Sequence, residues 1–231
     1  MSAETSAIAQ HPSPNCGPRR NGLTPQFIVL HYTAMDSAEA ALNRLCDPQA
    51  EVSAHYLIAG DGRIWQMVDE AARAWHAGPG CWQGLDDINS RSIGIELDNR
   101  GTHPFAAPQM TALEGVLRGI MQRWSIRPEH VIGHSDLAPE RKNDPGPRFD
   151  WCRLARQGLS IWPEGHLGHT EAKFDSLSEA FGYGADWSEV ARLRSFRDRF
   201  RPHATGLVSD ADLRCLSALV AQYAGADDTP A

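Results

Sequence analysis

The sequence predicts an α/β protein, in which a β-sheet is covered by helices, followed by a small all-helical C-terminal module. Short apolar, β-branched segments alternate with amphipathic segments over roughly the first 150 residues, a pattern typical of α/β folds. After Trp162-Pro163 the strand patterns stop and three short helical patterns follow. A chain of 231 residues is long enough for one sizeable domain with such an appendage.

The N-terminal region combines an arm with a strand and a helix. Residues 1–22 are polar, rich in Pro and without periodicity, so we expect an irregular arm that is laid over a domain or mobile. The segment FIVLH (27–31) fits a buried strand. Residues 37–47 carry Ala and Leu at helical spacing, with Ser37 or Asp36 as the expected N-cap.

A hairpin and a loop are expected next. The segment HYLIAGDGRIWQMV (55–68) predicts two strands around the turn Gly60-Asp61-Gly62. Residues 70–89 are loop-rich and combine Gly with Trp, a composition that suits a binding surface.

Two further strands and one long helix complete the expected α/β domain. The segments SIGIEL (92–97) and HVIGH (130–134) predict buried strands. Residues 108–124 predict an amphipathic helix, because apolar residues recur there every three or four positions. The segment GHSDLAPERKNDPGP (133–147) is too rich in Pro and Gly for a helix, and we expect an ordered loop.

Three helices are expected in the C-terminal module. The first covers residues 176–181, the second begins at Asp186 with Glu189 completing a capping box, and the third begins near Ser209 with Asp212 completing another. The second helix is expected to turn four apolar side chains inward: Val190, Leu193, Phe196 and Phe200. The predicted organisation is therefore an arm (1–22), an α/β domain (23–163), a linker (164–174) and a helical module (175–226).

Composition excludes several classes of protein. The formal charge of −7 argues against nucleic-acid binding, and no stretch approaches the roughly 18 apolar residues of a membrane span. The five cysteines are scattered without a CxxC pair, so neither a disulfide framework nor a zinc knuckle is indicated. The N-terminus has no basic start followed by an apolar core. We therefore expect a cytoplasmic protein, with a periplasmic location as the alternative if a leader has been removed.

Polar side chains end three of the predicted strands: His31, Glu96 and His134. Catalytic and ligand-binding residues of open α/β sheets gather at strand ends. With the carboxylate of Asp144, the two histidines form a His, His, Asp set. Three protein ligands leave one tetrahedral position for water, the pattern of catalytic zinc sites. Two nitrogen ligands favour zinc over magnesium or calcium.

Glu96 and Lys142 complete the expected site. Glu96 lies on a different strand from the ligands, so it could take a proton from the attacking water and pass it to a leaving amine. Lys142 precedes Asp144 by two residues, and in an extended segment both side chains point to the same side. Its ammonium could there stabilise a developing oxyanion. Together these groups indicate a hydrolase for an amide or an ester.

Each of these residues also has a simpler interpretation. A single strand-end histidine is more often a hydrogen-bonded structural residue. Glu96 could be a solvated strand end, and Lys142, next to Arg141, a solvated charge. The residue pattern alone leaves both interpretations open.

The same residues, in this order, resemble the type 2 N-acetylmuramoyl-L-alanine amidases, the zinc amidases related to peptidoglycan recognition proteins. The matching segments span almost all of the first 163 residues: VLHYT (29–33), VSAHYLI (52–58), AWHAG (74–78), NSRSIGIEL (89–97) and GHSDLAPERKNDPGP (133–147). The resemblance implies that the zinc ligands are His31, His134 and Asp144. It implies further that Glu96 is the catalytic carboxylate and Lys142 the oxyanion lysine.

This resemblance implies a reaction and a fold. The reaction is hydrolysis of the amide between N-acetylmuramic acid and the L-alanine of the peptidoglycan stem peptide, and the fold is a central mixed sheet with helices on its faces. Family members either recycle 1,6-anhydro-muropeptides in the cytoplasm or act on the wall after export. We expect a recycling enzyme, a monomer with zinc as cofactor and peptidoglycan fragments as substrate. An exported amidase acting on intact peptidoglycan and a non-catalytic recognition module are the alternatives.

Several residues of the matched segments could contact the substrate. Trp75 and His76 could line the substrate groove, or the loop could simply be held by its tryptophan. Asn89 could contact the peptide stem, and His55 is expected to support the sheet or a metal ligand. Asp87 stands where relatives that bind a diaminopimelate carboxylate often carry Arg, so the resemblance leaves the peptide preference open.

The C-terminal module matches less closely. The segment LRSFRDRFRP (193–202) is similar to the middle helix of a peptidoglycan-binding module, but HATGLVSD replaces the usual Asp-Gly turn after it. Five arginines make this helix the basic feature of an acidic protein: Arg192, Arg194, Arg197, Arg199 and Arg201. They could hold anionic peptidoglycan carboxylates, and a solvated helix face is the favoured interpretation.

Overall fold

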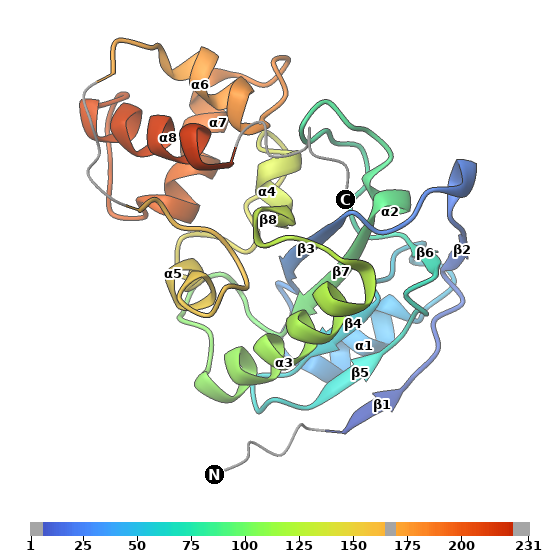
Figure 1. Cartoon of the computed structure of the whole chain (residues 1–231). Helices are drawn as coiled ribbons and strands as arrows, with labels where there is room; N and C mark the ends of the chain where they lie inside the picture. The colour runs from blue at the N-terminus through green and yellow to red at the C-terminus, as the bar shows by residue number, and fades with distance from the viewer. Residues whose placement is uncertain (1–6, 165–169, 224–231) are drawn as a thin grey trace.

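One mixed β-sheet with helices on both faces organises the described part of the chain, residues 7–164 and 170–223 of a computed structural model (Figure 1). Its strand order is β1-β5-β4-β7-β3-β8. The strands are β1 (Ile8–Gln10), β3 (Phe27–Tyr32), β4 (Tyr56–Ile58), β5 (Ile64–Gln66), β7 (Ser92–Leu97) and β8 (Val131–Gly133). Strands β4, β7, β3 and β8 are parallel to one another, β5 is antiparallel to β4, and β1 is parallel to β5. The expected mixed α/β fold is thereby confirmed.

Helix α3 (Ala107–Trp124) covers one face of the sheet. Alternate residues of β3 and β7, such as Ile28 and Ile95, pack with Leu113 and Leu117 of this helix in one buried cluster. The helix α5 (Trp151–Ala155) closes the same cluster with Trp151 and Leu154. The helix predicted over residues 108–124 is thus confirmed, and it begins one residue earlier, at Ala107.

The opposite face is covered by two groups of helices. Helix α1 (Ala38–Leu45) packs on Leu57 and Ala59 next to β4. The second group consists of α6 (Phe174–Phe181), α7 (Glu189–Phe200) and α8 (Asp210–Tyr223), which lie together beside α4 (His134–Leu137) and β8 (Figure 1). Their buried side chains share a cluster with Phe27, Val29 and Ile132 of the sheet. The C-terminal helices and the sheet thus have a common core.

Local sequence signals explain several elements. The Oγ of Ser37 accepts a hydrogen bond from the backbone N–H of Ala40 at 3.1 Å, which confirms Ser37 as the N-cap of α1. Strands β4 and β5 form the predicted hairpin, in which Gly62 adopts a φ of 92° that favours glycine. Short elements fill the rest: α2 (Ile88–Arg91) and the 3-10 turns at Arg20–Gly22 and Pro128–His130.

The N-terminal arm is more ordered than predicted. Within it, β1 joins the edge of the main sheet, and β2 (Cys16–Pro18) forms a separate antiparallel pair with β6 (Ala72–Ala74). Both strands have only three residues, and β1 is exposed along its length. Backbone hydrogen bonds at a sheet edge hold them, so they need no apolar alternation that could be seen in the sequence.

The segment from Gly133 to Pro147 also differs from the prediction, because it contains one helical turn. Helix α4 (His134–Leu137) starts directly after β8. Asp136 Oδ2 accepts the backbone N–H of Gly133 at 2.8 Å and so caps this turn. The prolines and glycines of the segment all lie outside residues 134–137, which is why they do not prevent it.

Helix α7 begins later than predicted and faces differently. Ser188, not Asp186, is the N-cap, because its Oγ accepts the N–H of Ala191. Val190 was expected to face inward but is 77% exposed, because it lies on the same outer face of the helix as the exposed Arg194, one turn later. The third helix has the predicted capping box, with Asp212 and Ser209 bonded to each other's backbone N–H groups.

The favoured interpretation of the α7 arginines as a solvated face is wrong. Three of them are buried: Arg192, Arg197 and Arg199. Each pairs with a carboxylate, because a buried guanidinium needs a partner for its charge.

Among the described helices, none combines the length and the apolar composition needed to cross a bilayer.

The shared core can be tested on α7 itself. Phe196→Ala should lower the free energy of unfolding by about 3–5 kcal/mol, because it removes a fully buried ring. Val190→Ala, on the same helix but exposed, should change it by less than about 0.5 kcal/mol. Urea denaturation measures both values, and similar small losses in the two variants would contradict the shared core.

Candidate metal centre and active site

All five residues that were predicted to carry the chemistry line one cavity of about 410 Å³. They are His31, Glu96, His134, Lys142 and Asp144. Trp75 and His76 also line it, as predicted for a groove. The sheet, the loop after β8 and the loop before α2 therefore meet at this point.

The register of β3 and β7 places His31 and Glu96 side by side. These two residues are direct partners in the parallel pair of strands. Because side chains alternate along a strand, His31 and Glu96 point away from the face that Leu30 and Ile95 turn toward α3. Both polar groups thus reach the cavity while their neighbours stay in the core.

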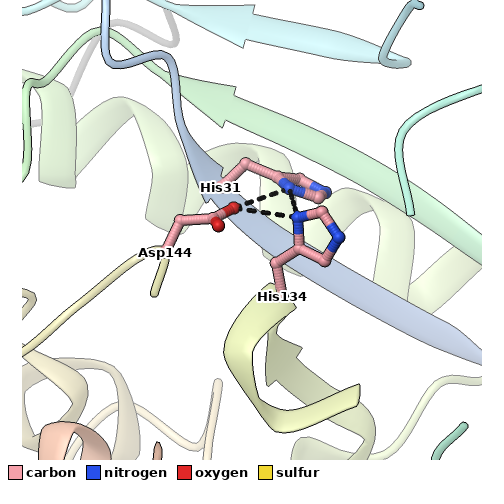
Figure 2. A group of neighbouring side chains, drawn as sticks. All are labelled: His31, His134 and Asp144. Atoms are coloured by element: carbon pink, nitrogen blue, oxygen red, sulfur yellow. Dashed lines mark hydrogen bonds and ion pairs between the residues drawn. The ribbon is translucent and has the colours of Figure 1, made fainter. Parts of the chain in front are cut away.

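Three ligand atoms converge above the end of β3 (Figure 2). His31 Nδ1 lies 2.9 Å from His134 Nδ1 and 2.9 Å from Asp144 Oδ2. His134 Nδ1 lies 3.1 Å from the same oxygen. All three residues are buried, and together they could hold a metal ion.

Hydrogen bonds on the far side of each imidazole indicate its tautomer. The hydroxyl of Ser92 donates to the carbonyl of Ile88 at 2.6 Å, so its oxygen can accept from His76 Nε2 at 3.2 Å. His76 Nδ1 can then accept from His31 Nε2 at 3.0 Å. This chain places the proton of His31 on Nε2 and leaves a lone pair on Nδ1.

His134 is oriented in the same way. Its Nε2–H donates to the carbonyl of Ala77 at 2.8 Å, which again leaves Nδ1 as the free nitrogen. Two lone pairs and a carboxylate oxygen then face one another at about 3 Å. Such a set of donors repels itself unless a cation lies among them. The chemistry of the three residues therefore fits a metal ion.

The pKa values of His31 and Asp144 are both lowered, although burial acts on them in opposite directions. Burial, with the neighbouring His134, lowers the pKa of His31 to about 4, so its imidazole is neutral at neutral pH. Burial opposes ionisation of Asp144, but the two histidines outweigh it and hold the pKa of this carboxyl below its usual range. The set is thus a neutral imidazole beside an ionised carboxylate.

Glu96 is a carboxylate without a protein partner on one oxygen. Its Oε2 is buried and accepts no hydrogen bond from the part of the chain that the structure describes. Burial, reinforced by Asp144 and opposed by Lys142, raises the pKa of Glu96 to about 8. A carboxylate with one buried, unpaired oxygen beside a three-ligand cluster has the proton affinity that a general base needs.

Other buried side chains support the ligands through hydrogen bonds to the backbone. Asn89 was predicted to contact the peptide stem, but it is 8% exposed and does not line the cavity. Its Oδ1 accepts the backbone N–H groups of His76 and Ala77, which fixes the loop that orients both ligand histidines. His55, expected to support the sheet, accepts the N–H of Gly94 at Nδ1.

One sequence signal did point to this arrangement. Gly94 lies in the middle of the apolar strand β7, and a glycine there marks the close approach of another group. A Cβ at this position would lie 2.4 Å from His76 Cγ. The glycine therefore makes room for the imidazole behind His31.

The mixed sheet brings a cluster that could hold a metal ion, a glutamate and a lysine into one cavity, an arrangement that suits a hydrolytic enzyme. The chain belongs to the N-acetylmuramoyl-L-alanine amidase family, whose profile matches residues 21–147.

Among curated proteins, it is 36% identical to the amidase AmiD of Escherichia coli K12, over 87% of this chain and 84% of that protein. It is 38% identical to the 1,6-anhydro-N-acetylmuramyl-L-alanine amidase AmpD of the same organism, over 62% of this chain and 87% of that protein. Among solved structures, AmpDh3 of Pseudomonas aeruginosa superimposes with a TM-score of 0.79 at 30% identity, covering 96% of this chain and 98% of its own.

The packing of His76 on Gly94 can be tested directly. Gly94→Ala should displace His76 and weaken zinc binding about 10- to 100-fold, because the group that orients a ligand is moved. Gly115→Ala is the control: its Cβ would meet open space in α3, and it should stabilise the protein by up to about 1 kcal/mol. Chelator competition measures the zinc affinity, and wild-type affinity in Gly94→Ala would contradict the orienting role.

Proposed function

We propose that the protein is a zinc-dependent amidase that hydrolyses the bond between N-acetylmuramic acid and the L-alanine of peptidoglycan stem peptides. The observation that carries this proposal is the convergence of His31, His134 and Asp144 with Glu96 and Lys142 in one cavity. Membership of the amidase family supports the choice of bond.

Zinc is the metal that suits this set of donors. Two imidazole nitrogens and one carboxylate oxygen are ligands that zinc prefers, whereas magnesium and calcium prefer oxygen. Zinc ligands at about 2.0–2.1 Å in a tetrahedron lie about 3.3 Å apart, close to the 2.9–3.1 Å between the three atoms here. When bound, zinc supplies Lewis-acid activation of water and of the scissile carbonyl.

Glu96 is the proposed proton carrier. Glu96 lines the same cavity as the ligand residues, and its raised pKa makes it a stronger base than an ordinary glutamate. It would take the proton of the attacking water and pass it to the nitrogen of L-alanine as the amide bond breaks. The same carboxyl group thus acts first as a base and then as an acid.

Lys142 is the proposed stabiliser of the oxyanion. The positive charge of its ammonium contributes to the low pKa of His31 and opposes the rise that burial causes in the pKa of Glu96, so both groups lie within its electrostatic reach. As the carbonyl oxygen becomes negative during attack, a fixed positive charge lowers the energy of that state.

The names of the relatives support a soluble anhydro-muropeptide as substrate. AmpD is a 1,6-anhydro-N-acetylmuramyl-L-alanine amidase, and the structure of E. coli AmiD contains anhydro-N-acetylmuramic acid-L-Ala-D-γ-Glu-L-Lys. A recycling role in the cytoplasm follows as part of the proposal. The alternative is an exported enzyme that acts on intact peptidoglycan.

Cations of the cavity suit the acidic stem peptide. Arg44, Arg141 and Lys142 line it, whereas Asp87 pairs with Arg73 at 3.4 Å and lies outside the lining. Position 87 therefore contributes no cation to the site. We propose that the cations that line the cavity recognise the carboxylates of the peptide.

Two substitutions should separate turnover from metal binding. Glu96→Ala should keep zinc but lose about 10²- to 10⁴-fold in kcat, because it removes the proton carrier. Asp144→Ala should lose zinc, because one of three ligands is gone. Elemental analysis and muropeptide hydrolysis measure the two properties; near wild-type turnover in the first variant, or undiminished zinc in the second, would overturn the assignment.

The substrate can be decided by a paired assay. The proposal predicts faster release of stem peptide from soluble anhydro-muropeptides than from intact sacculi, and recovery of the native protein in the cytoplasmic fraction. Faster hydrolysis of sacculi, together with recovery in the periplasm, would support the exported alternative instead.

A further inference from the structure

The segment from Gly133 to Pro147 carries two ligands and Lys142, yet its one regular element is the single turn α4. Within the segment, Ser135 N–H donates to the carbonyl of Asp144 at 2.9 Å, and Lys142 N–H donates to that of Ala138. Because few hydrogen bonds lie within the segment, its shape also depends on the elements that pack against it. Behind it lies α7, which packs against α4 (Figure 1).

Arg199 of α7 bonds to residues on both sides of His134 in the chain, Val131 of β8 and Asp136 of α4. Its Nη1 donates to Asp136 Oδ2 at 2.9 Å, and its Nη2 donates to the carbonyl of Val131 at 2.9 Å. Arg199 and Asp136 are 2% and 1% exposed, so the pair is screened from water. One guanidinium thus connects β8 with α4, the helical turn that begins with His134.

Asp136 gathers further contacts from the C-terminal helices. Its Oδ1 accepts the hydroxyl groups of Tyr183 at 2.9 Å and Ser195 at 3.1 Å. Its Oδ2 also accepts the backbone N–H of Gly133, the residue before His134. A single carboxylate therefore connects the C-terminal helices to the backbone next to a ligand.

Arg194 holds the other part of the segment. Its Nη2 donates to the carbonyls of Pro139 and Lys142, the second at 3.2 Å. Next to it, the backbone N–H of Ser188 donates to Glu140 Oε1 at 3.0 Å. The turn that presents Lys142 is thus fixed to the start of α7.

We propose that α7 is a clamp that sets the shape of the metal-binding segment, with Arg199 and Arg194 as positioning residues for His134 and Lys142. The C-terminal helices then contribute to catalysis through this segment, in addition to any contact with peptidoglycan. The inference rests on the proposed function for the roles of His134 and Lys142.

Arg197 provides a matched control on the same helix. It is buried and pairs with the buried carboxylate of Asp212 at 2.6 Å, and its other bonds go to the carbonyls of Gly206 and Leu207. These three partners all belong to the C-terminal helices and their connections. Arg197→Met therefore removes a buried ion pair without touching the metal-binding segment.

The full chain loaded with zinc is the sample for the test. Both Arg199→Met and Arg197→Met should lower the melting temperature. Arg199→Met alone should weaken zinc binding about 10-fold or more and lower kcat by a similar factor, with KM changed less than about twofold. Arg197→Met should keep zinc affinity and kcat within about twofold of wild type. Equal losses in the two variants, or wild-type values in Arg199→Met, would overturn the clamp.

Arg194 keeps the clamp testable if Arg199→Met does not fold, because Arg194 is exposed. Arg194→Ala should lower kcat about 10-fold with little change in KM or melting temperature, and Arg194→Lys should restore part of it. Val190→Ala, exposed on the same helix, should leave kcat unchanged. Wild-type kcat in Arg194→Ala would overturn the positioning of Lys142.

The readouts also separate this inference from the proposed function. If the wild-type protein binds zinc but hydrolyses no muropeptide, the proposed function fails, while zinc affinity in the Arg199 and Arg197 variants still decides the effect of the clamp on His134.

Discussion

The site depends on holding three ligand atoms, from two distant parts of the chain, within 3.1 Å of one another. His31 belongs to a central strand, whereas His134 and Asp144 belong to the segment that follows β8. Bringing two neutral nitrogens and a carboxylate together in a buried place is unfavourable without a cation. The protein therefore needs a framework stiff enough to keep this arrangement ready for a metal ion.

The sheet supplies the first part of that framework. Pairing of β3 with β7 sets His31 beside Glu96, and pairing of β3 with β8 sets the start of α4 beside them. Behind the ligands, the carbonyl of Ala77 and the ring of His76 decide which nitrogen of each imidazole is free. Oriented ligands bind a metal more tightly than mobile ones, because less freedom is lost on binding.

How much the sequence could predict depended on whether a contact is local. The hairpin, α1 and α3 follow from patterns within a few residues, and strand-end polarity correctly brought His31, Glu96 and His134 to one place. The edge strands β1 and β2 were missed because they depend on backbone pairing with distant segments.

Two further residues show the same limit. Arg199 was taken as solvated because its partner, Asp136, lies 63 residues earlier in the chain. Asn89 was expected to contact the peptide stem because it lies in a segment that resembles the amidases. Its bonds to the N–H groups of His76 and Ala77, 13 and 12 residues earlier, could not be predicted from that segment. A motif identifies which residues matter, but the contacts between distant segments decide what each one does.

The central claim is that His31, His134 and Asp144 bind zinc while Glu96 stays free to carry a proton. Anomalous X-ray diffraction at the zinc edge, from crystals of the zinc-loaded protein, tests it most directly. The account predicts one strong peak, bonded to His31 Nδ1, His134 Nδ1 and an Asp144 carboxylate oxygen at about 2.0–2.2 Å, with Glu96 not coordinated. A peak at other residues, or coordination by Glu96, would contradict it.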